Sequence, residues 1–139
     1  MTTKVAINGF GRIGRNVFRA FLESDADIEF VAINDITDSR TLAHLLKYDS
    51  IYGTLDGDVG FEENHISLSR KQVRVFSERD PGSIPWGDVG AQIVVESTGF
   101  FASREKAAAH LGDSVEKVII SAPAKGPDIT VCLGVNDDQ

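Results

Sequence analysis

The sequence predicts an α/β fold with a doubly wound, mainly parallel sheet and an inserted strand pair. Apolar runs of strand length alternate with helical patterns along most of the 139 residues, and such strands are typical of a parallel sheet covered on both faces. The first run leads into a G-x-G-x-x-G turn and then a helix. With right-handed crossovers, this order predicts one Rossmann-type domain over residues 1–139.

The first strand, turn and helix carry the most specific pattern in the chain. The strand covers Val5–Ile7 and ends at Asn8. After it, Gly9 permits a tight turn, Gly11 lets the backbone approach a pyrophosphate, and Gly14 lets the helix lie close to the strand. The helix is expected to pack through apolar residues at helical spacing, namely Ile13, Val17, Ala20 and Phe21.

The second strand, Ile28–Ile33, ends in Asn34 and Asp35. A dinucleotide-binding fingerprint requires an acidic residue about 20 residues beyond the glycines, because its carboxylate accepts the ribose hydroxyls. The free N–H groups of Arg12 and Ile13 at the helix start would bind the pyrophosphate. The alternative is a turn without a ligand, in which Asp35 caps the next helix.

The middle of the chain interrupts the alternation of strands and helices. A short helix is expected over Thr41–Tyr48, capped by Asp38 or Ser39. Beyond it, the alternating stretches His65–Leu68 and Gln72–Phe76 predict a strand pair.

The regular alternation resumes with a buried strand over Ile93–Glu96 that breaks at Ser97–Gly99. The elements expected after it are a helix over Arg104–Leu111 with Ser103 as its cap and Gly112 as its stop, and strands over Lys117–Ser121 and Ile129–Leu133. Ligands bind at the carboxyl ends of parallel strands. The loops holding the glycines, Asp35, Ser97–Gly99 and Ser121 should therefore converge.

Composition and charge exclude several classes of protein. With 42% hydrophobic and 25% charged residues, the chain has the composition of a globular domain. A net charge of −7 disfavours nucleic acid as the main partner. No apolar run approaches the ~20 residues that span a bilayer, so no membrane partner is expected. The single cysteine forbids an intramolecular disulfide and fits a reducing compartment, which predicts a cytoplasmic protein.

Several blocks of sequence, in order, resemble the phosphorylating glyceraldehyde-3-phosphate dehydrogenases. They are K-V-A-I-N-G-F-G-R-I-G-R-N at 4–16, A-I-N-D at 32–35, L-A-H-L-L-K-Y-D-S at 42–50, E-R-D-P at 78–81, V-V-E-S-T-G at 94–99 and K-V-I-I-S-A-P-A-K at 117–125. The resemblance covers essentially the whole chain and matches the amino-terminal half of that family. It implies the family's fold, its cofactor NAD and its place in glycolysis.

The resemblance assigns roles to individual residues. Arg12 and Ile13 would contact the pyrophosphate, Asp35 the adenosine ribose, and Arg79 the adenine; for Arg79 the alternative is a surface ion pair with Asp80 or Glu78. Thr98 and Gly99 would lie along the cofactor, and Ser121 near the nicotinamide ribose. The residues expected to form the NAD site are Asn8, Gly9, Gly11, Arg12, Ile13, Asn34, Asp35, Arg79, Ser97, Thr98, Gly99 and Ser121. No metal site is expected.

No catalytic residue is assigned in this chain. The resemblance implies that the nucleophilic Cys lies beyond the G-V-N sequence, here 134–136, and that the base His lies further on, whereas the sequence runs to Gln139. Cys132 lies inside the expected last strand and should be buried and inert. The histidines, His44, His65 and His110, are interpreted as solvated or capping residues.

Two further residues have structural explanations. Glu96 is expected to be a carboxylate that accepts backbone hydrogen bonds, with a general base as the alternative. Trp86, between Pro85 and Gly87, is expected to anchor a loop by burying its ring, with stacking on a ligand as the alternative.

The favoured hypothesis is the NAD-binding domain of a glyceraldehyde-3-phosphate dehydrogenase, unable to oxidise the aldehyde without the catalytic domain. The alternative is a non-catalytic NAD-responsive binding or assembly module, or half of a split enzyme. In the family, a helix from the far C-terminus covers one face of this domain. The apolar surface that lacks this cover should promote self-association.

Overall fold

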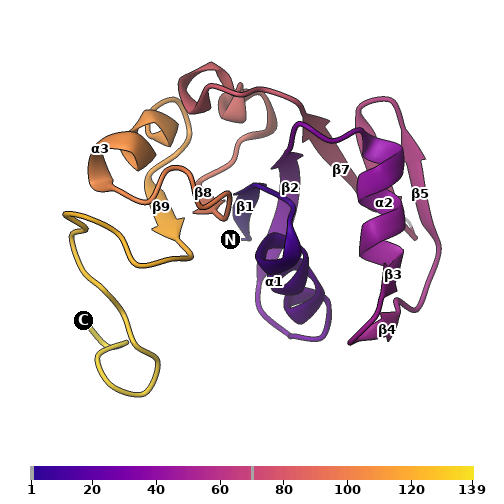
Figure 1. Ribbon diagram of the computed structural model, residues 1–139, viewed down its shortest axis with the longest axis horizontal. Helices are drawn as coiled ribbons and strands as arrows, with labels where there is room; N and C mark the ends of the chain where they lie inside the picture. The colour runs from indigo at the N-terminus through magenta and orange to yellow at the C-terminus, as the bar shows by residue number, and fades with distance from the viewer. Residues whose placement is uncertain (1, 70) are drawn as a thin grey trace.

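The computed structural model describes residues 2–69 and 71–139. Its centre is a sheet of seven described strands in the order β5-β6-β7-β2-β1-β8-β9, with helices on both faces (Figure 1). The strands are β1 (Thr3–Asn8), β2 (Ile28–Asn34), β5 (Val59–Glu62), β6 (His65–Leu68), β7 (Lys71–Phe76), β8 (Ile93–Glu96) and β9 (Lys117–Ile120). The predicted Rossmann-type α/β fold is confirmed.

The five strands from β7 to β9 in this order are parallel, and only the β5 and β6 edge is antiparallel. The predicted strand pair corresponds to β6 and β7, but β7 also pairs with β2, and β5 extends the edge beyond the prediction. A separate hairpin is formed by β3 (Tyr48–Asp49) and β4 (Gly53–Thr54). The chain starts at β1, builds one side of the sheet and returns to β8 on the other, so the strand order switches beside β1.

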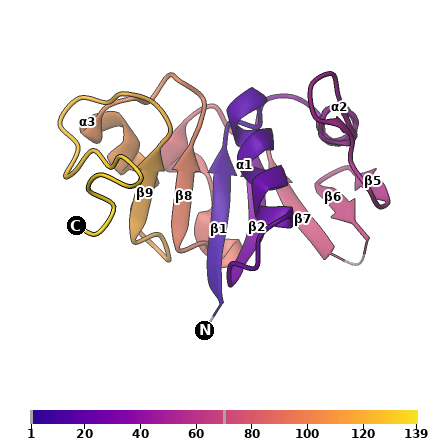
Figure 2. The same cartoon turned by 90° about the horizontal axis from the view of Figure 1, so that it is seen from below.

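Alternate residues of the central strands enter two apolar clusters on opposite faces. Val5 and Ile7 pack with the residues of α1 (Arg12–Leu22) and α2 (Ser39–Lys47), whereas Ala6 and Ala32 pack with Trp86 on the other face. The second layer holds the short helices η1 (Pro81–Ser83), η2 (Trp86–Val89), α3 (Arg104–Ala107) and η3 (Ala108–His110). Figure 2 shows α1 in front of β1 and β2, with α3 beside β9.

The helices differ from their predictions in detail. In α1 the buried residues are Gly14 and Phe18, and Phe21 is partly buried, so the helix packs at positions i, i+4 and i+7 counted from Gly14. Ile13 and Ala20, which were both predicted to pack, are exposed. Asp38 is confirmed as the cap of α2, since its side chain accepts the N–H of Thr41.

The predicted helix from Arg104 to Leu111 is shorter and divided. Ser103 caps α3, where its hydroxyl accepts the N–H of Lys106, and the chain then tightens into the 3₁₀ turn η3 before the positive φ of Gly112 ends it. None of the helices in the described ranges is long and apolar enough to cross a bilayer.

The predicted strand over Ile129–Leu133 is wrong. After β9 the chain leaves the sheet, and the yellow segment runs away from the rest of the molecule (Figure 1). Its apolar residues Ile129, Val131 and Leu133 are exposed, and so is Cys132, which was predicted to be buried. An apolar alternation forms a strand only when a neighbouring strand pairs with it, and no described strand does so here.

Candidate functional site

A cavity of about 480 Å³ opens where β1, β2 and β8 end, beside the switch in strand order. Ligands of doubly wound sheets bind at this position, and the volume is within the usual range for small-molecule pockets. The lining residues are Asn8, Gly9, Gly11, Asn34, Asp35, Ile36, Thr37, Glu78, Arg79, Ser97, Thr98, Phe100 and Phe101. A second hollow of about 720 Å³ lies against α3 and Lys125 and shares Phe100 with this cavity.

The cavity brings together most of the predicted site residues. Asn8, Gly9, Gly11, Asn34, Asp35, Arg79, Ser97 and Thr98 line it, whereas Arg12, Ile13, Gly99 and Ser121 lie outside the lining. Ser121 nevertheless reaches the predicted cluster, because its hydroxyl lies 3.2 Å from Ser97 Oγ and its N–H donates to Glu96 O at 3.0 Å. The loops after β1, β2, β8 and β9 therefore converge as predicted.

The three fingerprint glycines meet different surroundings. At Gly9, where φ is +89°, a Cβ would lie 2.8 Å from the Thr98 backbone nitrogen, and at Gly14 a Cβ would lie 2.3 Å from Gly9 O. At Gly11 a Cβ would meet no atom within 4 Å. Gly9 and Gly14 are thus required by the fold, whereas Gly11 borders open space where a ligand can approach the backbone.

The start of α1 provides unpaired backbone N–H groups. Gly11 caps the helix without a side chain, and the first bond of the helix runs from Arg15 N–H to Gly11 O at 3.0 Å. The amides of Arg12 and Ile13 have no partner within the helix, and the helix dipole adds positive potential at this end. The arrangement fits a phosphate.

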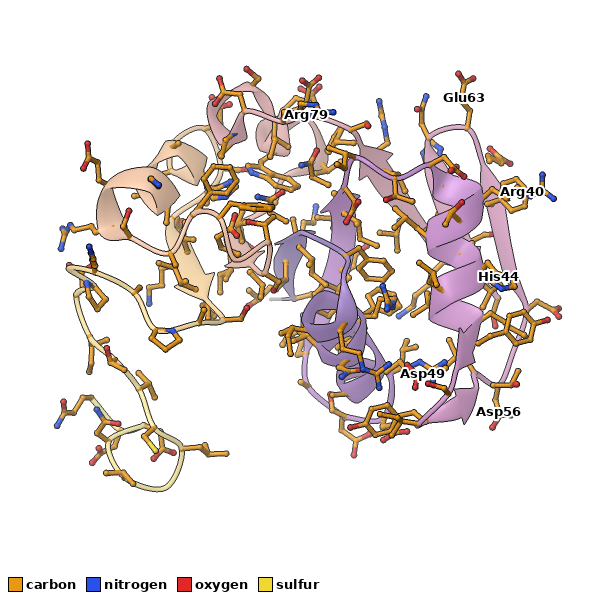
Figure 3. All side chains as sticks on the ribbon, viewed as in Figure 1. Arg40, His44, Asp49, Asp56, Glu63 and Arg79 are labelled. Carbon is orange, nitrogen blue, oxygen red and sulfur yellow. The ribbon has the colours of Figure 1, made fainter. Side chains whose placement is uncertain are left out.

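The Arg12 side chain does not face the cavity. Its guanidinium pairs with the Asp49 carboxylate, with Nη1 to Oδ2 at 2.5 Å and Nη2 to Oδ1 at 3.2 Å, and lies over the Tyr52 ring. The hydrogen bond with Asp49 raises the pKa of Arg12, and the same bond holds the pKa of Asp49 well below its usual range. Figure 3 shows Asp49 next to α1. Any phosphate contact by Arg12 is therefore made by its backbone.

Asp35 lies between the loop after β1 and the turn after β2. Its Oδ2 accepts the N–H of Phe10 at 2.8 Å, and its Oδ1 accepts the N–H of Thr37 at 2.9 Å. The alternative in which Asp35 caps α2 is excluded, because Asp38 does so. Each carboxylate oxygen keeps a lone pair for a further donor, such as a ribose hydroxyl.

Arg79 lines the cavity from the segment after β7, at the end of the molecule toward which β2 points (Figure 3). The alternative ion pairs are not formed, since among residues 2–69 and 71–139 no carboxylate lies within 4.0 Å of its guanidinium. Asp80 instead caps η1 by accepting the N–H of Gly82.

Beneath the cavity, Glu96 is a fully buried carboxylate at the end of β8. It accepts hydrogen bonds from Asn8 Nδ2 at 2.5 Å, His110 Nε2 at 3.0 Å, and the N–H and hydroxyl of Thr98 at 2.9 and 2.7 Å. Burial opposes the charge, but these bonds outweigh it and lower the pKa of Glu96, which stays ionised. Its predicted structural role is confirmed, although side chains supply most of the donors.

The prediction for His110 is wrong, whereas that for Trp86 is confirmed. His110 is only 2% exposed and lies between Glu96 and Trp86, whose Nε1–H donates to His110 Nδ1 at 3.1 Å. Trp86 is equally buried and anchors its loop in the second core layer. His44 is exposed, as predicted.

Sequence reasoning missed five lining residues, which are Ile36, Thr37, Glu78, Phe100 and Phe101. All five are within two positions of a predicted site residue, so a wider window around each motif would have included them. The exposure of Ile36 and Phe100, at 63% and 78%, gives the cavity an apolar rim.

Comparison with known proteins agrees with this geometry. The family described as "Glyceraldehyde 3-phosphate dehydrogenase, NAD binding domain" matches residues 3–104. Glyceraldehyde-3-phosphate dehydrogenase 1 of Bacillus cereus is 58% identical over 137 residues, which cover 99% of this chain and 41% of that protein. The Geobacillus stearothermophilus enzyme is 58% identical over 139 residues, covering 100% of this chain and 41% of the relative.

The glyceraldehyde-3-phosphate dehydrogenase of Thermotoga maritima is 56% identical over 137 residues, 98% of this chain and 41% of its own length. The chain thus spans about two-fifths of these relatives. The family match confirms the predicted resemblance and the predicted cofactor. The chain belongs to the family of glyceraldehyde 3-phosphate dehydrogenase NAD-binding domains, and its cofactor is NAD.

Proposed function

We propose that the cavity at the ends of β1, β2 and β8 holds the dinucleotide through the residues predicted from the sequence. The observation that carries this is the open space at Gly11 beside the unpaired amides of α1, with the Asp35 carboxylate on the adjoining strand. The amides of Arg12 and Ile13 bind the pyrophosphate, and Asp35 accepts the adenosine ribose hydroxyls.

The remaining predicted residues complete the site. Arg79, free of ion pairs with the described carboxylates, lies beside the adenine, and the exposed Phe100 and Ile36 offer it apolar contact. Thr98 and Gly99 lie along the cofactor, and Ser121 lies toward the nicotinamide ribose. Asn8 and Asn34 shape the floor together with Gly9 and Ser97.

In the whole protein, we propose, this chain is the cofactor domain over residues 1–139, and a catalytic domain provides the cysteine nucleophile and the histidine base. The bound NAD accepts a hydride during oxidation of the aldehyde. By itself the chain binds NAD without turnover. It acts in the cytoplasm, its main partner is not nucleic acid, and its exposed apolar side chains, such as Ile51 and Leu133, favour self-association.

Calorimetric titration of this chain with NAD tests the site. In Gly11→Ala the added methyl meets no protein atom, so the fold should lose about 1 kcal/mol or less, the scale of a helix-cap change. The methyl occupies the space where the pyrophosphate approaches, so NAD affinity should fall at least about tenfold. Unchanged affinity in a folded Gly11→Ala variant would overturn the proposed placement.

A further inference from the structure

The last residues of three adjacent strands form a polar row beneath the cavity. Asn34 of β2 is paired in register with Asn8 of β1, which is paired in register with Glu96 of β8. These side chains are 4%, 2% and 2% exposed. Buried polar groups are costly unless their hydrogen bonds are satisfied, so the partners of this row define its function.

One chain of hydrogen bonds reaches Glu96 from the second core layer. The Trp86 indole can only donate, so its bond at 3.1 Å requires an unprotonated Nδ1 on His110. We therefore assign the Nε2–H tautomer to His110, which donates to Glu96 Oε1 at 3.0 Å. Trp86 thus fixes the direction of the hydrogen bond that His110 gives to Glu96.

A second chain reaches Glu96 along the polar row. The backbone N–H of Glu78 donates to Asn34 Oδ1 at 2.9 Å, and Asn34 Nδ2 donates to Asn8 Oδ1 at 2.8 Å. Asn8 Nδ2 then donates to Glu96 Oε1 at 2.5 Å. Asn34 Nδ2 also donates to Glu78 O at 2.9 Å. Both backbone groups of Glu78, the residue before Arg79, are therefore hydrogen-bonded to the Asn34 side chain.

On the cavity side, the other oxygen of Glu96 holds the loop after β8. Oε2 accepts both the N–H and the hydroxyl of Thr98, and the Thr98 hydroxyl accepts the N–H of Phe100 at 3.1 Å. Apart from the bond that Asn34 gives to Glu78 O, the hydrogen bonds of these chains run toward the single buried carboxylate. Glu96 is therefore linked by hydrogen bonds to two segments that line the cavity, directly to Thr98–Phe100 and through Asn8 and Asn34 to Glu78–Arg79.

We propose that Glu96, oriented by His110, is the positioning residue of the nucleotide site. It holds the lining segments in their binding arrangement before the cofactor enters, although neither side chain lines the cavity. A site whose walls are already ordered loses less conformational entropy on binding. The inference rests on the proposed placement of NAD in this cavity.

The mutational test compares two replacements of His110. His110→Leu removes the donor to Glu96, and NAD affinity measured by calorimetry should fall about tenfold, because the lining segments are no longer ordered before the cofactor binds. His110→Gln retains an amide donor in place of Nε2–H and should stay within about threefold of the parent chain. Val115→Ala is the matched control, because Val115 packs with Trp86 but takes no part in the hydrogen bonds; it should lower stability and leave NAD affinity unchanged.

Amide hydrogen exchange of the unsubstituted chain gives a second test that does not depend on a folded variant. Without NAD, the amides of Thr98 and Phe100 should be protected to a degree comparable with β8. The proposal is overturned if these amides exchange freely until NAD is added, or if His110→Leu binds NAD as tightly as the parent. Failure of the parent chain to bind NAD would instead refute the proposed function.

Discussion

The carboxylate of Asp35 accepts the backbone N–H of Phe10 at 2.8 Å and so joins the loop after β1 to the turn after β2. The N–H of Thr37 is bound by the other oxygen at 2.9 Å. The residue proposed to bind the ribose is therefore also a structural link between the glycine loop and the second strand. Substitutions of Asp35 should change both the fold and the affinity for NAD.

Asp35→Ala should weaken NAD binding about 5- to 150-fold, corresponding to the ~1–3 kcal/mol of charge-assisted hydrogen bonds. It should also lower the free energy of unfolding, because Phe10 and Thr37 lose their acceptor. Calorimetry and urea denaturation measure the two effects separately. Asp38→Ala is the matched control: it removes the cap of α2, costs about 1 kcal/mol of stability, and leaves NAD affinity intact. Equal affinities in the two variants would contradict the assigned role of Asp35.

The cofactor preference should follow from the same carboxylate. A 2′-phosphate on the ribose would be repelled by the negative charge of Asp35, and the hydrogen bond from the 2′-hydroxyl to this carboxylate would be lost. NADP should therefore bind at least about tenfold more weakly than NAD. Titrations of the parent chain and of Asp35→Ser with each cofactor measure the ratio of NAD affinity to NADP affinity. This ratio should be smaller in the variant. A parent chain that binds the two cofactors equally would contradict the prediction.

Gly14→Ala should destabilise the fold whether or not NAD is present. The new methyl would lie 2.3 Å from Gly9 O, which is backbone, so α1 must shift away from β1, at a cost of about 1–3 kcal/mol. Thermal unfolding of Gly14→Ala beside Gly11→Ala compares a crowded position with an open one. Equal stability in the two variants would mean that α1 does not pack this closely on the glycine loop.

Acidification should weaken the fold through Glu96. Because folding lowers the pKa of Glu96, its ionised form contributes stability that is fully present above the ordinary value of 4.5 and is lost as the pH falls through the lower folded value. The unfolding free energy of Glu96→Gln should therefore fall less steeply than that of the parent between about pH 5 and pH 3. The slope is the readout, because Glu96→Gln also changes the hydrogen bonds that this buried side chain can accept. Identical slopes would show that folding does not lower the pKa of Glu96.

Cys132 should react with a thiol reagent in the folded chain. It is exposed on the segment that leaves the sheet after β9, away from the cavity, so NAD should not slow the reaction. Labelling at neutral pH with and without NAD, with Cys132→Ser as the blank, measures this. Labelling that requires denaturant would mean that this segment packs against the domain.

Local pattern was sufficient for most of the sheet and for eight of the residues that line the cavity. The apolar runs of β1, β2 and β8 each end in a polar residue, Asn8, Asn34 or Glu96, and these residues meet at one edge because parallel strands share a direction. The cap at Asp38 could also be predicted from the sequence, because the Asp38 carboxylate and the Thr41 N–H that it accepts are only three residues apart.

The errors concern residues whose environment is set by distant segments. His110 lies at a helix end, where exposure is common, but its partners Trp86 and Glu96 lie 24 and 14 residues away. The Ile129–Leu133 segment has the alternation of a strand and lacks a described neighbour. Spacing alone also misassigned Ile13, because the buried face of α1 is set by the contact of Gly14 with the glycine loop.

Because the Arg12 guanidinium pairs with Asp49, the phosphate contact that we propose at the start of α1 depends on peptide groups. Peptide groups are common to all residues except proline, so side chains at this helix start can diversify without erasing phosphate affinity. Substitution of Arg12 should thus loosen the neighbouring hairpin at Tyr52 while sparing the ligand. A change of side chain at position 12 should therefore affect the stability of this hairpin more than the affinity for NAD.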